Sequence, residues 1–298
     1  MRAASFRPNE ITPLKHQKIK TRSEDEAIFG RLLGLIESVI PANETLDAIG
    51  IAAPGPLNPR TGVILDTPNI DEWDNFPIVE KLKAHFSVPV YLGNDANLAA
   101  LGEWRFGAGR GHEHLLYLTI STGVGGGVIS GGHLLEGVDG LGAELGHVTV
   151  LADGPLCGCG HRGHLEALSS GTAIAKYVDD QLKDESTVSS LRSSSTRTAK
   201  TIAAAAQSGD ELAISAFNRA GRYLGIGVAS FLHIFNPSVL IFGGGVSMSG
   251  DLLFKPFRAS LKEHIFGHTY LDNLKITTAE LGDDAGLLGA LALVEMKA

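Results

Sequence analysis

Short apolar runs that stop abruptly at glycine or proline turns constrain the fold of this chain more than any other feature. Three runs end in this way: residues 46–53 before Pro54-Gly55-Pro56, residues 88–92 before Gly93-Asn94-Asp95, and residues 238–242 before Gly243-Gly244-Gly245. A continuous apolar run of this length is typical of a strand that is buried on both faces of a sheet. Segments with the apolar spacing of helices lie between the strands, including a long one over about 213–235. This alternation predicts an α/β protein.

The length and charge of the chain limit what it can be. It has 298 residues, of which 44% are hydrophobic, so it can bury a large core and is long enough for two lobes. A net charge of −8 without any Lys/Arg run argues against a nucleic-acid partner. No apolar run reaches the roughly 20 residues of a membrane-spanning helix, and the N-terminus lacks the apolar segment of a signal peptide. Two cysteines do not make a disulfide scaffold. We therefore expect a cytoplasmic protein without a nucleic-acid or membrane partner.

Residues 147–166, HVTVLADGPLCGCGHRGHLE, contain the two cysteines of the chain and two histidines at metal-ligand spacing. Cys157, Cys159 and His164 form a C-x-C-x4-H arrangement, and His147 lies a short hairpin upstream. Two thiolates and two imidazoles are a donor set that tetrahedral Zn²⁺ accepts readily. The alternatives are two inert cysteines or a redox pair, but a disulfide between residues this close is strained and the spacing is not C-x-x-C. The pattern predicts a structural zinc site.

Two glycine loops have the composition of phosphate and nucleotide sites. Residues 119–128, TISTGVGGGV, lie between two predicted strands, and the hydroxyls of Ser121 and Thr122 add donors to the glycine N–H groups. The alternative is a glycine-rich hairpin that binds nothing; a Walker loop is excluded because no Gly-Lys-Ser/Thr follows. Gly243-Gly244-Gly245 lies beyond the carboxyl end of a strand, where α/β folds bind ligands. A plain strand-to-helix turn explains the triplet equally well.

Three acidic residues are candidates for chemistry on a polyol. Asp95 follows a buried strand, where it is placed to cap the next helix and equally to act as a general base on a hydroxyl. Glu144 and Glu166 bracket the predicted zinc stretch, and a metal knot can orient both carboxylates toward sugar hydroxyls. The alternative is that both glutamates are ordinary surface acids.

Together these motifs resemble the ROK family of sugar kinases and sugar-responsive repressors, which includes bacterial glucokinases. The segments that carry the resemblance are Ala52-Ala53-Pro54-Gly55-Pro56, Pro68-Asn69, Gly93-Asn94-Asp95-Ala96-Asn97, residues 121–127, residues 142–147, residues 157–166, Gly243-Gly244-Gly245 and residues 284–290. The resemblance covers about Leu46 to the C-terminus.

The resemblance implies a fold, an activity and a set of site residues. The fold is of the actin/hexokinase (ribonuclease H-like) type, with two α/β lobes around a cleft: a smaller lobe of residues 1–107 plus 284–298, and a larger lobe of residues 108–283. The activity is ATP-dependent phosphorylation of a hexose or an N-acetylhexosamine, with Mg²⁺ accompanying ATP, by a homodimer or homotetramer. The implied roles are: Asp95 as general base; Asn69, Asn94, Asp95, Glu144, His147 and Glu166 on the sugar; Thr122 and Gly123 on the phosphates; Gly243, Gly244 and Gly245 on the nucleoside; and His147, Cys157, Cys159 and His164 on zinc.

Two features depart from the family pattern. His164 stands where the family usually has a third cysteine, which makes the zinc set Cys₂His₂; His161 is an alternative ligand. The family also opens with a strand and an Asp-x-Gly-Gly-Thr phosphate loop, which has no counterpart before Met1 here. We expect that the native protein starts some 10–15 residues upstream; the alternatives are a fragment, or a member that binds or senses sugar without kinase activity. Loss of that strand predicts unpaired strand edges in the first sheet.

Overall fold

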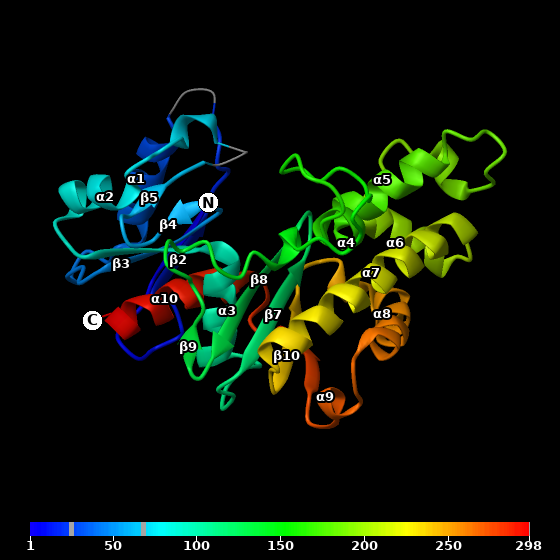
Figure 1. Ribbon diagram of the computed structural model, residues 1–298. Helices are drawn as coiled ribbons and strands as arrows, with labels where there is room; N and C mark the ends of the chain where they lie inside the picture. The colour runs from blue at the N-terminus through cyan, green and yellow to red at the C-terminus, as the bar shows by residue number, and fades with distance from the viewer. Residues whose placement is uncertain (24–26, 67–69, 298) are drawn as a thin grey trace. The chain divides into compact units, whose positions relative to one another are not determined.

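The computed structural model describes residues 1–23, 27–66 and 70–297 of the chain (Figure 1). Helices and strands alternate, so the predicted α/β class is confirmed. The chain forms two compact units. The first comprises Met1–Arg110, Leu134–Ala143 and Asp283–Ala298, and the second comprises Gly111–His133 and Glu144–Gly282. The lobe boundaries expected from the sequence stay a prediction.

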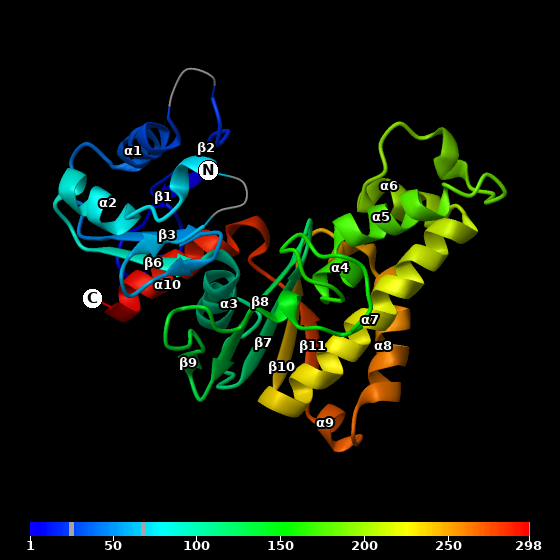
Figure 2. The same cartoon turned by 45° about the horizontal axis from the view of Figure 1, so that its top comes forward.

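In the part of the chain that the structure describes, the first unit is built around short strands and four helices. Its strands are β1 (Arg2–Ser5), β2 (Lys15–Lys18), β3 (Ile49–Ala53), β4 (Leu57–Asn58), β5 (Val63–Ile64) and β6 (Val90–Asn94), and its helices are α1 (Ile28–Val39), α2 (Ile78–Phe86), α3 (Asp95–Phe106) and α10 (Ala285–Lys297), with a 3-10 turn at Asp71–Trp73. Strands β3 and β6 are parallel, with Ala53 opposite Asn94 at their carboxyl ends. In Figure 2 the two strands lie between α2 on one side and α10 on the other. This pairing places the turn that starts at Asn94 at the edge of the sheet.

Helices α3 and α10 pack closely because glycines stand where they touch. A Cβ atom at Gly102 would overlap the carbonyl oxygen of Ala285, and one at Gly289 would overlap the carbonyl oxygen of Leu98. The backbones of the two helices therefore meet directly, which fixes the helix that begins at Asp95 against the C-terminal helix.

The first unit does not have one continuous sheet within the described residues. Strand β1 pairs with β2 in antiparallel register, and β3 pairs with β6, but the two pairs are separate sheets. A cavity of about 1380 Å³ is lined by the residues of β1 and β3, together with apolar side chains from α1 and α10 such as Ile36 and Leu291. The edges of β1 and β3 and the apolar side chains of α1 and α10 thus border the same cavity.

The second unit contains a five-stranded sheet in the order β11-β10-β7-β8-β9. The strands of this sheet are β7 (Leu115–Ile120), β8 (Val124–Ser130), β9 (His133–Leu134, at the boundary between the units), β10 (Val239–Gly243) and β11 (Lys275–Thr278). The helices of the unit are α4 (Glu166–Ser169), α5 (Gly171–Gln181), α6 (Ala199–Gln207), α7 (Glu211–Phe235), α8 (Asp251–His264) and α9 (Thr269–Asp272), with 3-10 turns at Leu145–His147, Ser190–Ser193 and Ser247–Ser249. A further 3-10 turn, Gly282–Asp284, lies where the chain passes into the first unit. Strand β10 is parallel to β7, and β8 is antiparallel to β7. The long helix α7 packs along α8 (Figure 1). Among the described residues, no helix is long and apolar enough to cross a membrane.

Candidate functional site

The Asn94–Asp95 turn joins β6 to α3, and each side chain has a separate structural task. The Asn94 side-chain oxygen accepts hydrogen bonds from the N–H groups of Ala96 (3.0 Å) and Asn97 (3.1 Å), so Asn94 is the N-cap of the helix. Of the two roles left open for Asp95, helix capping is therefore wrong: Asp95 is the first residue of the helix, and its Oδ1 accepts the Ala96 N–H at 2.8 Å. Asn94 is therefore the cap, and the Asp95 carboxyl adds a hydrogen bond to the Ala96 N–H in the first turn.

The Asp95 carboxyl has the electrostatic character of a base. Asp95 is exposed, yet protein groups surround its carboxyl closely enough that desolvation raises its pKa. Hydrogen bonds from backbone N–H groups oppose the shift without cancelling it. A raised pKa makes the carboxylate a stronger proton acceptor than an ordinary aspartate.

The turn between β7 and β8 contains the first glycine loop. The Ser121 N–H donates to the Gly123 carbonyl at 2.9 Å, and the side chains of Ser121 and Thr122 are exposed. A Cβ atom at Gly123 would overlap a carboxylate oxygen of Glu166. Any larger residue at position 123 would therefore have to displace the end of the Glu166 side chain from its present place.

The second glycine loop lies next to the first. Gly243 is opposite Thr119 in the parallel pairing of β10 with β7, and the Val246 N–H donates to the Ile120 carbonyl at 2.9 Å. Gly244 has a φ of +84°, and a Cβ there would overlap the Ile120 backbone. The structure thus brings Thr122 and Gly123 together with the glycine triplet at one edge of the sheet.

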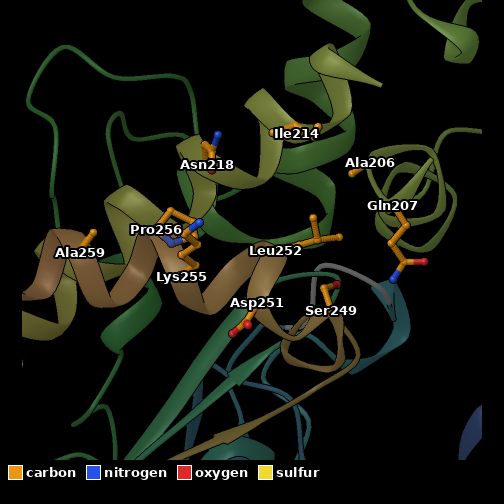
Figure 3. Close-up of a pocket in the computed structure, with 10 residues that line it drawn as sticks. All are labelled: Ala206, Gln207, Ile214, Asn218, Ser249, Asp251, Leu252, Lys255, Pro256 and Ala259. Carbon is orange, nitrogen blue, oxygen red and sulfur yellow. The ribbon is translucent and has the colours of Figure 1, made fainter. Parts of the chain in front are cut away.

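A pocket of about 720 Å³ is lined in part by residues that follow the triplet closely in the sequence (Figure 3). Ser249 and Asp251, which follow the triplet, line it together with Asn218 of α7 and Lys255 of α8, and α6 closes one side. Sequence reasoning missed this pocket. The spacing of Gly221 and Gly225 on α7 indicates only that a helix packs closely there, because a Cβ at either position would collide with α8.

The four predicted zinc ligands come together in the second unit. His147 ends the 3-10 turn Leu145–His147, and an antiparallel bridge from Thr149 to His164 closes the hairpin around the cysteines. Ligand atoms of His147, Cys157, Cys159 and His164 all lie within 4.8 Å of one another. His161, the alternative ligand, is exposed and does not belong to this group.

Two distances within the cluster are close to those expected around a tetrahedral ion. Cys157 Sγ lies 3.8 Å from His147 Nδ1, and Cys159 Sγ lies 3.2 Å from His164 Nδ1. Ligands around one zinc ion stand about 3.3–3.8 Å apart, as follows from bond lengths of about 2.0–2.3 Å. Burial lowers the pKa of His164, which favours the neutral ligand form, and burial raises the pKa of the Cys157 thiol to about 11. Binding a metal ion therefore requires displacement of the thiol protons.

The remaining predicted sugar residues lie in different parts of the chain. Glu166 begins α4, and its Oε2 accepts the N–H of Val124 at 3.0 Å. Glu144 is exposed just before the turn that carries His147. Glu144 and Glu166 belong to the second unit with His147, whereas Asn94 and Asp95 belong to the first. Asn69 lies outside the described residues.

Comparison with known proteins identifies the family. The ROK family model matches residues 4–297. A glucokinase of Thermotoga maritima is 40% identical over 266 residues, which cover 88% of this chain and 84% of the relative. The crystal structure of a ROK family glucokinase from Streptomyces griseus, in complex with glucose and AMPPNP, matches with a TM-score of 0.79 and 35% identity over 96% of this chain and 93% of that one. A xylose repressor of Caldicellulosiruptor bescii is 32% identical over 96% of this chain and 72% of its own length.

These similarities define a protein of the class that contains both sugar kinases and sugar-responsive repressors. The chain belongs to the ROK family. The resemblance inferred from its motifs is therefore confirmed, and so is the actin/hexokinase-like fold type, which its structural neighbours share.

Proposed function

We propose that this chain is an ATP-dependent hexose kinase of the glucokinase kind, which phosphorylates a hydroxyl of a hexose or an N-acetylhexosamine. The observation that carries the proposal is the Asp95 carboxyl, which lies at the carboxyl end of β6, on the first residue of a helix that Asn94 caps, and whose pKa is raised by desolvation. Membership of a family whose members include glucokinases 36–40% identical to this chain supports the same activity.

In this proposal Asp95 takes the proton from the acceptor hydroxyl while that oxygen attacks the γ-phosphorus of ATP. The bond between the γ-phosphorus and the β–γ bridging oxygen breaks, and ADP leaves with the electron pair. Phosphoryl transfer depends mainly on positioning and charge stabilisation, so one well-placed base and a set of fixed donors suffice on the protein's side.

The two glycine loops take the nucleotide. Thr122 and Gly123 face the phosphates, to which the exposed Thr122 hydroxyl and the N–H groups of the loop donate. Gly243, Gly244 and Gly245 approach the nucleoside, and the pocket beside Ser249 and Asn218 accepts its base. Mg²⁺ arrives with ATP and neutralises charge on the phosphate oxygens.

Carboxylates and amides select the sugar. Asn69, Asn94, Glu144, His147 and Glu166 hold its hydroxyls in this proposal. Asn94 uses its oxygen to cap α3, so its Nδ2 is the group that donates to the sugar. A wall of this kind rejects an analogue that lacks a hydroxyl, because its polar groups would then be buried without a partner.

His147, Cys157, Cys159 and His164 hold a structural zinc ion in this proposal. The ion cross-links the two ends of residues 147–166, and so fixes the positions of His147 and Glu166, which contact the sugar in this proposal. Assembly as a homodimer or homotetramer in the cytoplasm is also part of the proposal.

A sugar-binding or sugar-sensing protein without kinase activity is the second candidate. The observation that favours it is the similarity to xylose repressors, which extends over 96% of this chain. The two candidates share the sugar residues and differ in whether nucleotide is consumed.

The test is ADP release from Mg²⁺–ATP by the purified chain with glucose and with N-acetylmannosamine, compared with Asp95→Asn. Sugar-dependent release that disappears in the variant supports the kinase. Sugar binding by calorimetry without any ADP release supports the sensor.

A further inference from the structure

Glu166 touches two parts of the second unit that the proposed function treats separately. Its Oε1 lies 3.4 Å from Cys157 Sγ in the Cys/His cluster, and its Oε2 accepts the Val124 N–H in the glycine loop at 3.0 Å. The absent side chain of Gly123 makes room for the same carboxylate. While Cys157 carries its thiol proton and donates to Oε1, one side chain therefore bridges the Cys/His cluster and the loop of residues 121–127.

The backbone of Glu166 is held by the cluster. Glu166 is two residues beyond the donor His164, and the intervening Leu165 is fully buried, with its N–H donating to the Val148 carbonyl at 3.0 Å. When the cluster is closed, the start of α4 has little freedom to move. The reach of the Glu166 carboxylate to Val124 therefore depends on the shape of the cluster.

The other side of the loop is held by α5. The Gly171 N–H donates to the Ser121 carbonyl at 2.8 Å, and the Thr172 hydroxyl donates to the Thr122 carbonyl at 2.8 Å. The loop is thus fixed at both ends, by α5 before Gly123 and by Glu166 after it. Release of the Glu166 contact frees one of these two anchors.

We propose that Glu166 is a positioning residue that couples the metal state of the Cys/His cluster to the conformation of the glycine loop. A metal-closed cluster holds the carboxylate on the Val124 N–H, and this contact sets the direction of the N–H groups around Gly123. By linkage, a perturbed loop also weakens retention of the metal. The consequence for nucleotide affinity rests on the proposed function, whereas the coupling between cluster and loop does not.

The direction of the change in nucleotide affinity distinguishes a positioning role from a simple charge effect. A carboxylate beside a phosphate loop repels the phosphates, so if charge alone mattered, Glu166→Gln and Glu166→Ala would both bind nucleotide more tightly. A positioning role predicts that Glu166→Gln binds nucleotide with the affinity of the wild type, because its side-chain oxygen still accepts the Val124 N–H. Glu166→Ala would then bind nucleotide more weakly.

The experiment measures amide hydrogen exchange at Val124 in the zinc-loaded protein, before and after removal of zinc with a chelator. We expect exchange to rise about tenfold in Glu166→Ala, the factor of one lost hydrogen bond to a charged acceptor, and to stay near wild type in Glu166→Gln. Zinc removal should produce a similar rise in the wild type and little further change in Glu166→Ala, because both act through one contact. Asp153→Ala, an exposed acid in the same stretch, is the matched control and should change neither quantity.

Gly123→Ala perturbs the same contact from the loop side and leaves every donor of the cluster in place. Its Cβ must displace the Glu166 carboxylate, so we expect raised exchange at Val124 and faster loss of zinc to the chelator. Two results would overturn the proposal. One is a rate of zinc loss in Gly123→Ala that equals the wild-type rate. The other is a chelator-induced rise in Val124 exchange that is equally large in the wild type and in Glu166→Ala. Calorimetry with Mg²⁺–AMPPNP supplies the nucleotide arm. Absence of binding by the wild type would count against the kinase proposal and leave the exchange results to decide the coupling.

Discussion

Replacement of Asp95 by asparagine separates the chemistry of this side chain from its structural contacts. Asn94 caps α3, and an asparagine oxygen at position 95 can still accept the Ala96 N–H, so the helix start should remain intact. What is lost is the proton acceptor. A positioned general base contributes about 10²–10⁴-fold to a rate, which corresponds to about 3–5.5 kcal/mol of activation free energy. We expect kcat for sugar phosphorylation to fall by that factor.

The same substitution should make the protein more stable at neutral pH. Desolvation raises the pKa of Asp95 above that of an unfolded aspartate, so between the two pKa values the folded state binds more protons than the unfolded state. Stability contributed by this group is therefore present at low pH and is lost as pH rises through the folded-state pKa. At pH 7 the ionised carboxylate destabilises the fold, and a neutral asparagine removes that penalty.

The assay couples ADP release to a spectroscopic signal, and calorimetry measures sugar affinity in parallel. The matched control is Asp180→Asn, which removes an exposed carboxylate paired with Lys183 and should change kcat by less than about twofold. A drop in kcat of less than tenfold in Asp95→Asn, with sugar affinity unchanged, would refute the assignment of Asp95 as the base. A lower Tm at pH 7 would refute the desolvation argument.

Three further predictions follow from other parts of the structure. Metal analysis of protein purified without chelator should find one zinc per chain, and Cys159→Ser should reduce this to well below one with a lower Tm; metal-free wild type would contradict the site. Gly289→Ala should destabilise by about 1–3 kcal/mol in urea unfolding despite its better helix propensity, because the new Cβ meets the rigid Leu98 backbone; equal or greater stability would contradict the packing of α3 on α10. The amides of Ala4 and Ala52 should exchange faster than those of their strand neighbours, because the register directs them away from β2 and β6 into the cavity; equal protection would show that this edge is paired.

The sequence predicted the elements that carry strong local signals. The strands predicted before glycine or proline turns became β3, β6 and β10, and the long apolar-periodic segment became α7. Burial along the whole strand is confirmed only for β10, because β3 has an exposed residue at Ala52 and β6 is partly accessible at Tyr91 and Asn94. These runs are long or sharply bounded, so hydrophobic pattern and turn residues agree. Helix α8 was not predicted. Its sequence contains Pro256, which argues against a helix, and it packs against glycines of α7 that are distant in the sequence.

The candidate site was predictable where donors are close in sequence. Cys157, Cys159 and His164 lie within one hairpin, so spacing alone indicated a cluster that the structure assembles. The cap at Asn94 and the Glu166–Val124 contact could not be predicted. The first depends on which of two adjacent polar side chains turns toward the helix, and the second joins residues that are 42 positions apart.

The measurement that tests the central claim most directly is ADP release from Mg²⁺–ATP by this chain, with glucose and N-acetylmannosamine offered as acceptors. The kinase account predicts release that depends on one of these sugars and saturates with its concentration. Folded, zinc-loaded protein that binds a sugar but releases no ADP would contradict that account and favour a sugar-sensing protein.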